Sequence, residues 1–331
     1  MKKTSIFLSI LGSCLGIGII LIIVGTLMGG RIGDFSIHPI AKNQEGVSHT
    51  LSDVSLTDTT DIQNISLDLS AASVKVITGD SFSITGGNLS KNEVTDGTWK
   101  IKTKHGFELS FFGFHLDIPL PNKLFHFNDD DSKIIITIPK TAVLDSAKVD
   151  LDAGDIHIEK LHCNKNVEID LDAGDVTIDS IEAGKATFNV DAGDIEVKQY
   201  TIHDSASLDC SMGDISFGTK ATALKNVCNN LNTDCSMGNI DVYGKLTGES
   251  HADASMGDID LRLVGSNVNY TIGNTDSSMG EISYTTKDFI NNSENYAVSD
   301  DHSVYGTLNF SCSMGNIDIC YLYASTPRTD L

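Results

Sequence analysis

Apolar and polar residues alternate along much of the chain, and one six-residue pattern recurs eight times. The first copy reads Leu151-Asp-Ala-Gly-Asp-Ile156, and the last reads Cys312-Ser-Met-Gly-Asn-Ile317. The alternation of period two stops at the glycine and resumes after the next residue, which predicts two β-strands joined by a bend. Glycine can supply the positive φ or the bulge that such a bend needs. The central glycines are Gly154, Gly174, Gly193, Gly213, Gly238, Gly257, Gly280 and Gly315.

The spacing of these glycines predicts how the repeats assemble. Four of the seven intervals are 19 or 20 residues long. A unit of this length cannot bury its own apolar side, whereas stacked units bury a continuous core. The pattern therefore predicts an all-β fold, a single-stack β-solenoid resembling a parallel β-helix over residues 141–323. Each motif position then forms a ladder with a spacing of about 4.8 Å.

Three ladders are expected to face the interior of this stack. The residue two positions after each glycine is Ile or Val, and the residue three positions before it is Leu or Val in the first three copies and mostly small later. The residue just before the glycine is Ala in three copies and Met in five. Placing both variable positions inside would exchange large with small side chains and keep the core filled.

The segments that flank or interrupt the repeats have separate predictions. Residues 62–140 hold a degenerate first repeat, with Ala72 at the glycine position, and an aromatic-rich block at 98–139. This block is expected to cap the first rung, and a surface that docks lipid or a partner is the alternative. The longer intervals predict loops at 218–230 and 285–306. The second loop is expected to cover the last rung, with end-to-end association as an alternative. Residues 324–331 form a tail.

The N-terminus predicts a membrane anchor. Lys2 and Lys3 precede an uncharged run over residues 6–28, which is long enough to cross a bilayer as a helix. Residues 1–30 are therefore expected to hold a transmembrane helix, and the lysines favour a cytoplasmic N-terminus. Residues 31–61 would then be a linker, and the rest of the chain would be extracytoplasmic. A cleaved signal peptide and lipidation at Cys14 are the alternatives.

Several of these features together resemble a known family. They are the anchor, the segment Leu-x-Leu-Ser-Ala-Ala-Ser-Val-x-Val at 67–76, the Ile-x-Ile-Pro-Lys strand at 136–140 and the Gly-Asp-Ile-x-Ile repeats. The chain is similar over about residues 62–320 to the bacterial putative-adhesin β-strand-repeat family, a domain of unknown function. The resemblance implies a β-solenoid at the bacterial envelope and supplies no catalytic motif.

The net charge of −22 argues against nucleic-acid binding, because an acidic surface repels phosphate. Stacking also brings carboxylates of neighbouring repeats close together, and oxygen ligands at this density suit Ca²⁺. The alternative interpretation is that aspartate and serine at these turns satisfy backbone N–H groups without a metal. The acidic candidates are Asp150, Asp152, Asp155, Asp170, Asp172, Asp175, Asp191 and Asp194.

No residues are singled out for catalysis or for binding a cofactor. Every carboxylate of the repeats belongs to a ladder, and none breaks the pattern as an active-site acid would. Cys210 and Cys235 share one interior position, and a disulfide between adjacent rungs is geometrically allowed. The sequence thus favours a non-enzymatic, membrane-anchored envelope protein for adhesion or envelope interactions, with a protein or polysaccharide partner. The alternatives are an accessory or sensor component of an envelope-stress system and a carbohydrate-active β-helix enzyme. An oligomer is compatible with each.

Overall fold

The computed structural model describes residues 35–39, 62–87, 89–103, 107–111, 114–118, 133–288 and 303–323. The chain divides into two compact units, one of residues 1–47 and 105–121 and one of residues 48–104 and 122–331. Within the described ranges, the helical segments are two single 3-10 turns, η3 (Ala223–Lys225) and η4 (Asn267–Asn269). The prediction of an all-β fold is confirmed.

The first unit contains a small antiparallel sheet. Its strands are β1 (Phe35–Pro39), β7 (Phe107–Phe111) and β8 (Phe114–Ile118), in the order β1-β7-β8. The predicted membrane helix at 6–28 lies outside the described residues. Over the ranges that are described, no helix has the length and apolarity needed to span a bilayer.

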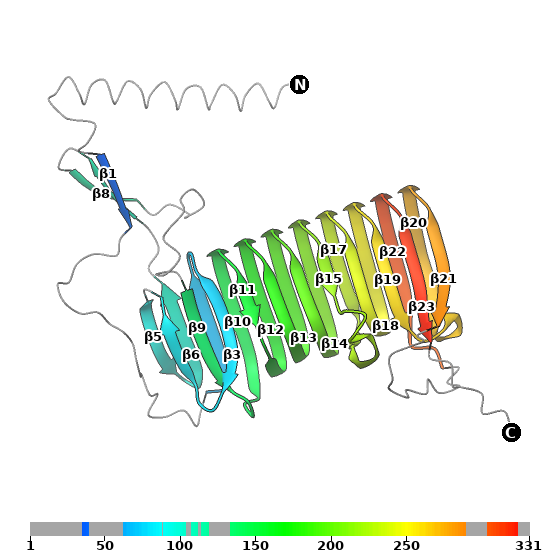
Figure 1. Ribbon diagram of the computed structural model, residues 1–331, viewed down its shortest axis with the longest axis horizontal. Coiled ribbons are helices and arrows are strands. Elements are labelled where there is room, and N and C mark those ends of the chain that lie inside the picture. Colours follow the sequence, from blue (N-terminus) through cyan, green and yellow to red (C-terminus); the bar gives the residue numbers. More distant parts are fainter. Residues whose placement is uncertain are drawn as a thin grey trace, which may run out of the picture. The chain divides into compact units, whose positions relative to one another are not determined.

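The second unit is a stack of parallel, in-register rungs, each being one turn of the chain around a shared core (Figure 1). The face that leads into each bend consists, in spatial order, of β6 (Thr98–Thr103), β2 (Asn64–Leu69), β10 (Leu144–Ala153), β12 (Leu161–Ala173), β13 (Val176–Ala192), β14 (Ile195–Met212), β17 (Leu231–Met237), β18 (Ile240–Met256), β22 (Gly306–Met314) and β20 (Tyr270–Met279).

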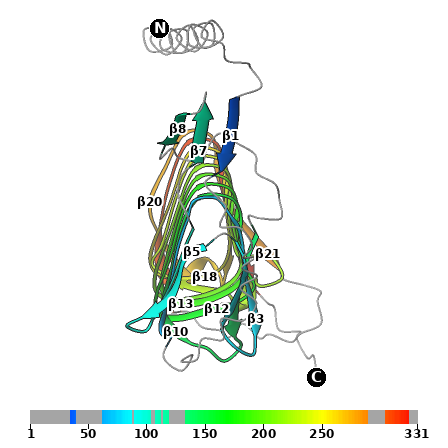
Figure 2. The same cartoon turned by 90° about the vertical axis from the view of Figure 1, so that its left-hand side faces the viewer.

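The face that leaves the bend repeats this order. It consists of β9 (Lys133–Pro139), β3 (Ser73–Gly79), β11 (Ile156–Ile158), the first halves of β13 and β14, β15 (Ile215–Phe217), the first half of β18, β19 (Ile259–Val264), β23 (Ile317–Tyr323) and β21 (Ile282–Asp288). Figure 2, which looks along the stack, shows the rungs superimposed around one narrow core.

The register confirms two of the three predicted interior ladders, one on each side of the bend. Leu151 pairs with Leu171, and Ile156 pairs with Val176. These side chains are at most 1% exposed, as are Ile195, Ile215 and the other branched residues two positions after the glycines, apart from Ile282 of the outermost rung. Burial of a side chain of this size stabilises the fold by about 1.5–3 kcal/mol, so the interior ladders dominate its stability.

The last repeat in the sequence is not the last rung in space. Ile317 pairs with Ile259 on one side and with Ile282 on the other, so β22 and β23 lie between the preceding rung and the rung of β20 and β21. The expectation that the last repeat forms the terminal rung is therefore wrong, and its Ile317 and Ile319 are fully buried. The long interval between Gly280 and Gly315 gives the chain enough length to return by one rung. Residues 289–302 of the predicted capping loop lie outside the described residues.

The N-terminal end shows the same exchange. The first repeat, β2 and β3, is the second rung, and β6 and β9 stack outside it. Two antiparallel strands close this end, β5 (Leu89–Thr95) against β6 and β4 (Ser83–Gly86) against β9. Trp99 is 1% exposed and packs edge-on against Phe82 at a centroid distance of 6.0 Å. Part of the predicted capping block thus covers the first repeat. The side chains of residues 104–132 are not among those described.

The predicted loop at 218–230 occupies a corner of the stack. Its central part is η3, and the chain then rejoins the stack as β16 (Val227–Asn229) between β14 and β18. Asn226 is fully buried at this corner. It accepts a hydrogen bond from the Tyr200 N–H at 3.1 Å and donates one to the Tyr243 carbonyl at 2.9 Å. The insertion is therefore anchored by a satisfied polar residue rather than excluded from the core.

Candidate functional site

The Gly-Asp bend is the most regular polar feature of the stack. The two residues before each glycine and the one after it face outward, because the chain begins to turn before it reaches the glycine. Each central glycine has φ between 123° and 158°, a region open to glycine and costly for other residues. A Cβ atom on Gly213 would lie 2.1 Å from the Gly193 carbonyl oxygen of the preceding rung. The glycine therefore allows both the turn and the close contact between rungs.

The first repeat has an alanine, Ala72, at the position of the bend glycine, and the next bend at Gly154 packs directly on it. A Cβ atom on Gly154 would meet the Ala72 carbonyl oxygen at 2.0 Å, so Ala72 serves as the base for the next bend. The strands that precede Ala72 in space, β6 and β9, come from segments separated by residues 104–132. Ala72 itself is not among the non-glycine residues with positive φ.

The residue after each glycine builds a hydrogen-bonded column that we name the bend ladder. Asp155 Oδ1 accepts a hydrogen bond from the Asp175 N–H at 3.1 Å, and Asp175 Oδ1 accepts one from the Asp194 N–H at 2.9 Å. Five further bonds continue this pattern at 2.7–3.1 Å. In spatial order the ladder is Asp155, Asp175, Asp194, Asp214, Asn239, Asp258, Asn316 and Glu281.

The bend ladder assigns a structural role to three of the predicted calcium ligands. At the bend, the glycine N–H and the N–H of the residue after the aspartate bond to carbonyls of the next rung, for example Gly154 to Ala173 and Ile156 to Asp175. The intervening N–H has no such carbonyl, and the carboxylate of the preceding rung accepts its hydrogen bond. Asp155, Asp175 and Asp194 therefore satisfy backbone donors, as the alternative interpretation of these residues expected.

The other calcium candidates form two separate ladders. Asp150 pairs in register with Asp170, and the positions two before the glycines hold Asp152, Asp172 and Asp191. Burial raises the pKa of Asp170, and repulsion by Asp150 and Asp172 raises it further. Among the residues described, no three His, Cys, Asp or Glu side chains are grouped so as to hold a metal ion. Calcium binding stays a hypothesis.

A profile for one protein family matches residues 62–319, which is most of the chain and all of its repeats. The chain belongs to the Toastrack DUF4097 family. The resemblance inferred from the repeats is confirmed. The family name itself states no activity.

Two solved structures resemble the Toastrack domain. The first is a putative adhesin from Bacteroides fragilis, with 14% identity and a TM-score of 0.38, covering 79% of this chain and 92% of that one. The second is a putative cell adhesion protein from Clostridium sporogenes, with 14% identity and a TM-score of 0.18, covering 80% and 95%. A search of curated proteins finds no match.

Methionines line the bend of the later Toastrack rungs, and sequence reasoning placed them wrongly. The residue before each glycine was expected inside the core, yet the five methionines at this position are 41–63% exposed. The three alanines of the earlier rungs are also partly exposed. The alternation fails here because the strand starts to turn one residue before the glycine. The exchange of large and small side chains therefore does not fill the core.

The described cysteines of the Toastrack domain are buried and free. Cys210 and Cys235 are in register, as predicted, and their thiols donate hydrogen bonds to the carbonyls of Gly193 and Gly213 at 3.2 Å. The adjacent Cys235 side chain and burial raise the pKa of Cys210. All six described cysteines are free, so the disulfide that the geometry allows is not formed.

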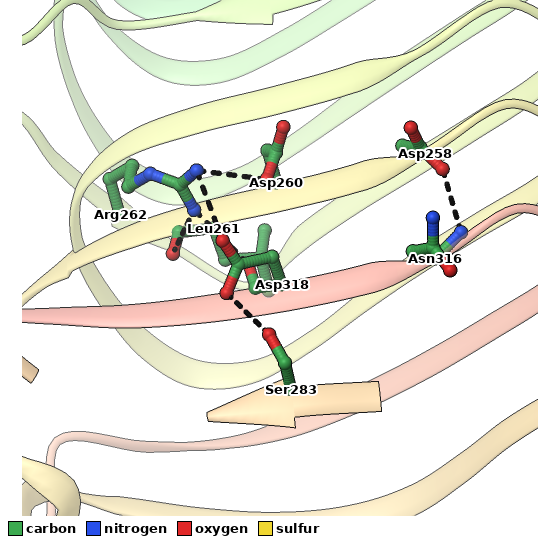
Figure 3. Close-up of polar contacts among 7 residues, drawn as sticks. All are labelled: Asp258, Asp260, Leu261, Arg262, Ser283, Asn316 and Asp318. Carbon is green, nitrogen blue, oxygen red and sulfur yellow. Dashed lines mark hydrogen bonds and ion pairs between the residues drawn. The ribbon is translucent and has the colours of Figure 1, made fainter. Parts of the chain in front are cut away.

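One cation joins the rung of β19 to the inserted rung of β23 (Figure 3). Arg262 Nη2 of β19 lies 2.9 Å from Asp260 Oδ1 and 3.3 Å from Asp318 Oδ2 of β23. Ser283 of β21 donates a hydrogen bond to Asp318 Oδ1 at 2.7 Å. Arg262 is the single arginine within the described ranges. No role was predicted for Arg262 from the sequence, although one arginine among the acidic residues of the later repeats was a visible signal.

Two shallow depressions lie on the surface of the Toastrack domain. One, of about 190 Å³, is bordered by Lys140, Lys160 and His162 at the N-terminal end. The other, of about 220 Å³, lies beside the bend ladder and is bordered by Asp194 and Glu196 among others. The second depression repeats the acidic ladder chemistry from rung to rung and brings no histidine or lysine to a carboxylate.

Proposed function

We propose that this protein is a membrane-anchored envelope protein whose extracytoplasmic solenoid presents a non-catalytic surface for adhesion or for contacts within the envelope. The observation that carries the proposal is the in-register repetition of outward side chains. Equivalent residues recur about every 4.8 Å along the stack, which gives an extended surface of uniform chemistry. Solenoid proteins use such extended surfaces to bind large partners. A polysaccharide or an envelope protein has the length to contact several rungs together.

The bend ladder supports a binding role over a catalytic one. A catalytic acid or base needs an environment that differs from that of its neighbours, because that difference shifts its pKa. Asp175, Asp194 and Asp214 each accept one N–H bond from the next rung and lie in equivalent surroundings. The proposed function requires no cofactor, and diffuse cations would screen the acidic ladders.

Site-specific photo-crosslinking in cells tests the binding proposal. Thr187 and Thr177 both lie on outward positions of β13, on the faces before and after the bend respectively. A photoreactive amino acid at each residue gives two matched probes on opposite faces, and the buried Ile178 gives a control. We expect adducts with envelope polymer or protein from at least one face and none from Ile178. Adducts with neither face would contradict the proposal. Adducts confined to one membrane signalling protein would favour the envelope-stress alternative.

The proposed location is tested separately. An epitope tag after Leu331 should be removed by protease added to intact cells whose wall has been stripped, because the lysines at the N-terminus favour an extracytoplasmic C-terminus. A cytoplasmic protein of the same cells, tagged in the same way, is the control. Full protection of the tag at Leu331 would place the domain on the other side of the membrane.

A further inference from the structure

Every methionine of the described residues lies in one exposed column. We name it the methionine ladder; in spatial order it consists of Met212, Met237, Met256, Met314 and Met279. Their exposed fractions are 49%, 43%, 41%, 42% and 63% in this order. Methionine is ordinarily a residue of protein cores, where its flexible side chain fills irregular gaps. Here none of the described methionines is in the core, which calls for an explanation at the surface.

The register brings the thioethers within reach of one another. Met237 pairs directly with Met212 on one side and with Met256 on the other. Paired residues of parallel strands are about 4.8 Å apart, and methionine has three rotatable side-chain bonds. Three sulfur atoms from three consecutive rungs can therefore converge on one point without movement of the backbone. No other part of the described chain brings methionine sulfurs together.

The neighbouring residues leave the thioethers as the exposed soft donors. Cys210 and Cys235 are fully buried, and their thiols already donate hydrogen bonds to glycine carbonyls. The bend-ladder residue of the same rung as Met212 is Asp214, whose Oδ1 accepts the Asn239 N–H at 2.7 Å. The ladder thus offers neutral sulfur ligands beside an acidic surface that attracts cations.

We propose that the methionine ladder is a binding site for soft monovalent metal ions of the Cu(I) and Ag(I) class. Thioether sulfur is a soft ligand that selects such ions, whereas Ca²⁺, Mg²⁺ and Zn²⁺ favour oxygen, nitrogen or thiolate ligands. The earlier rungs hold Ala153, Ala173 and Ala192 at the same position, so the site is confined to the later half of the stack. This inference does not depend on the proposed adhesive function.

Silver ion is a suitable probe because it does not change oxidation state in air. The full chain, with methionine methyl groups labelled with ¹³C, is titrated with silver nitrate in detergent and chloride-free buffer. We expect the methyl signals of the five ladder methionines to shift, while those of Met1 and Met28 stay unchanged as internal controls. Zn²⁺ and Ca²⁺ should leave the ladder signals in place. Absence of a silver-dependent shift in the ladder, or equal shifts with Zn²⁺, would overturn the proposal.

A matched variant separates sulfur ligation from apolar packing and from silver bound by cysteines. Met237→Leu, Met256→Leu and Met314→Leu together keep the apolar volume and all cysteines but remove the three central sulfurs. We expect the silver affinity measured at the methyl groups of Met212 and Met279 to fall at least tenfold, with unchanged melting in the absence of silver. Ala192→Met, which extends the ladder by one rung beside Met212, should add a shifting signal. An unchanged affinity in the triple variant would refute a site built from the ladder sulfurs.

Discussion

The middle rungs and the outermost rung at 270–288 carry the same motif but experience different surroundings. Ile215, in the middle, is fully buried between two neighbours, whereas the equivalent Ile282 is covered on one side and is only partly buried. Tyr284, two residues further along β21, is 50% exposed. The comparison distinguishes the contacts that a residue makes with the preceding rung from those that it makes with the following rung.

The glycine and the aspartate of the bend interact with different neighbours: the glycine with the preceding rung and the aspartate with the following rung. The glycine is required by the preceding rung, whose carbonyl leaves no room for a Cβ atom, and this holds for Gly280 as well as for Gly213. The aspartate is required by the following rung, because its carboxylate accepts a hydrogen bond from a backbone N–H of that rung. The outermost rung has no following rung within the described residues, and it alone has a glutamate, Glu281, at this position.

The largest expected effect is the burial of a charge in the middle of the stack. Ile215→Asp should lower the free energy of unfolding by about 3–5 kcal/mol, because the carboxylate would have no partner in the core. Ile282→Asp should cost about 1–2 kcal/mol, since water reaches one side of this rung. Ser216→Asp, one residue along and outward, should cost less than about 1 kcal/mol. Denaturant unfolding measures all three. Equal losses for Ile215 and Ser216 would contradict the assignment of inward and outward positions.

The glycine requirement should be the same in both regions. Gly213→Ala and Gly280→Ala should each cost about 2–5 kcal/mol, because both the positive φ and the carbonyl of the preceding rung oppose a Cβ atom. A Cβ atom would lie 2.1 Å from that oxygen at Gly213 and 1.8 Å at Gly280. Thermal melting of the two variants tests this equality. A harmless Gly280→Ala would show that the outermost bend is free to relax.

Removing a side chain of the bend ladder should have a smaller effect on the free energy of unfolding, and this effect should differ between the middle rungs and the outermost rung. Asp194→Ala removes the acceptor for the Asp214 N–H and should cost about 1 kcal/mol, since water can replace it in part at this exposed bend. Asp194→Asn keeps the acceptor oxygen and should cost less than about 0.5 kcal/mol. Glu281→Ala should be neutral because this side chain serves no described rung. A loss at Glu281 equal to that at Asp194 would refute the directional account of the ladder.

The smallest effect concerns the charge of the outward ladders. Burial raises the pKa of Asp234, and repulsion by Asp209 and Asp253 adds to the rise. The folded state therefore binds a proton more readily than the unfolded state, so this residue's contribution to stability increases as pH falls from 7 through its folded pKa. Asp234→Asn should stabilise the protein by a few tenths of a kcal/mol at pH 7, with the gain vanishing near pH 3. Melting curves at several pH values measure the difference from the wild type, and a constant difference across this range would contradict it.

The sequence predicted the features that depend on the repeat itself. The eight glycines, the branched residues that follow them and the stacked register were all visible in the alternation of period two. The orientation of Met212 and its equivalents was missed because alternation holds only within straight strands. The order of the rungs was missed because the inward position two after the glycine holds isoleucine in all the later repeats, so it does not distinguish Ile317 from Ile282 as a neighbour of Ile259. Two residues of the outer rung did depart from the pattern, Glu281 at the bend and Ser277 at the inward position that pairs with Cys312.

The exchange of the last two rungs has a consequence for how the chain folds as it is made. Residues 270–288 emerge from the ribosome before 306–323, when the edge of β18 and β19 is still open and offers them the same register. In that early arrangement Asp258 would accept the Glu281 N–H. If the final repeat were then added outside this rung, the Asn316 N–H would lie beside Glu281. The Glu281 side chain is one methylene longer than the aspartates that accept this hydrogen bond at the other bends. The native order lets Asn316 accept the Glu281 N–H and lets Arg262 reach Asp318. We therefore expect the last step of folding to be an insertion between neighbours that have already met, slower than the addition of each earlier rung.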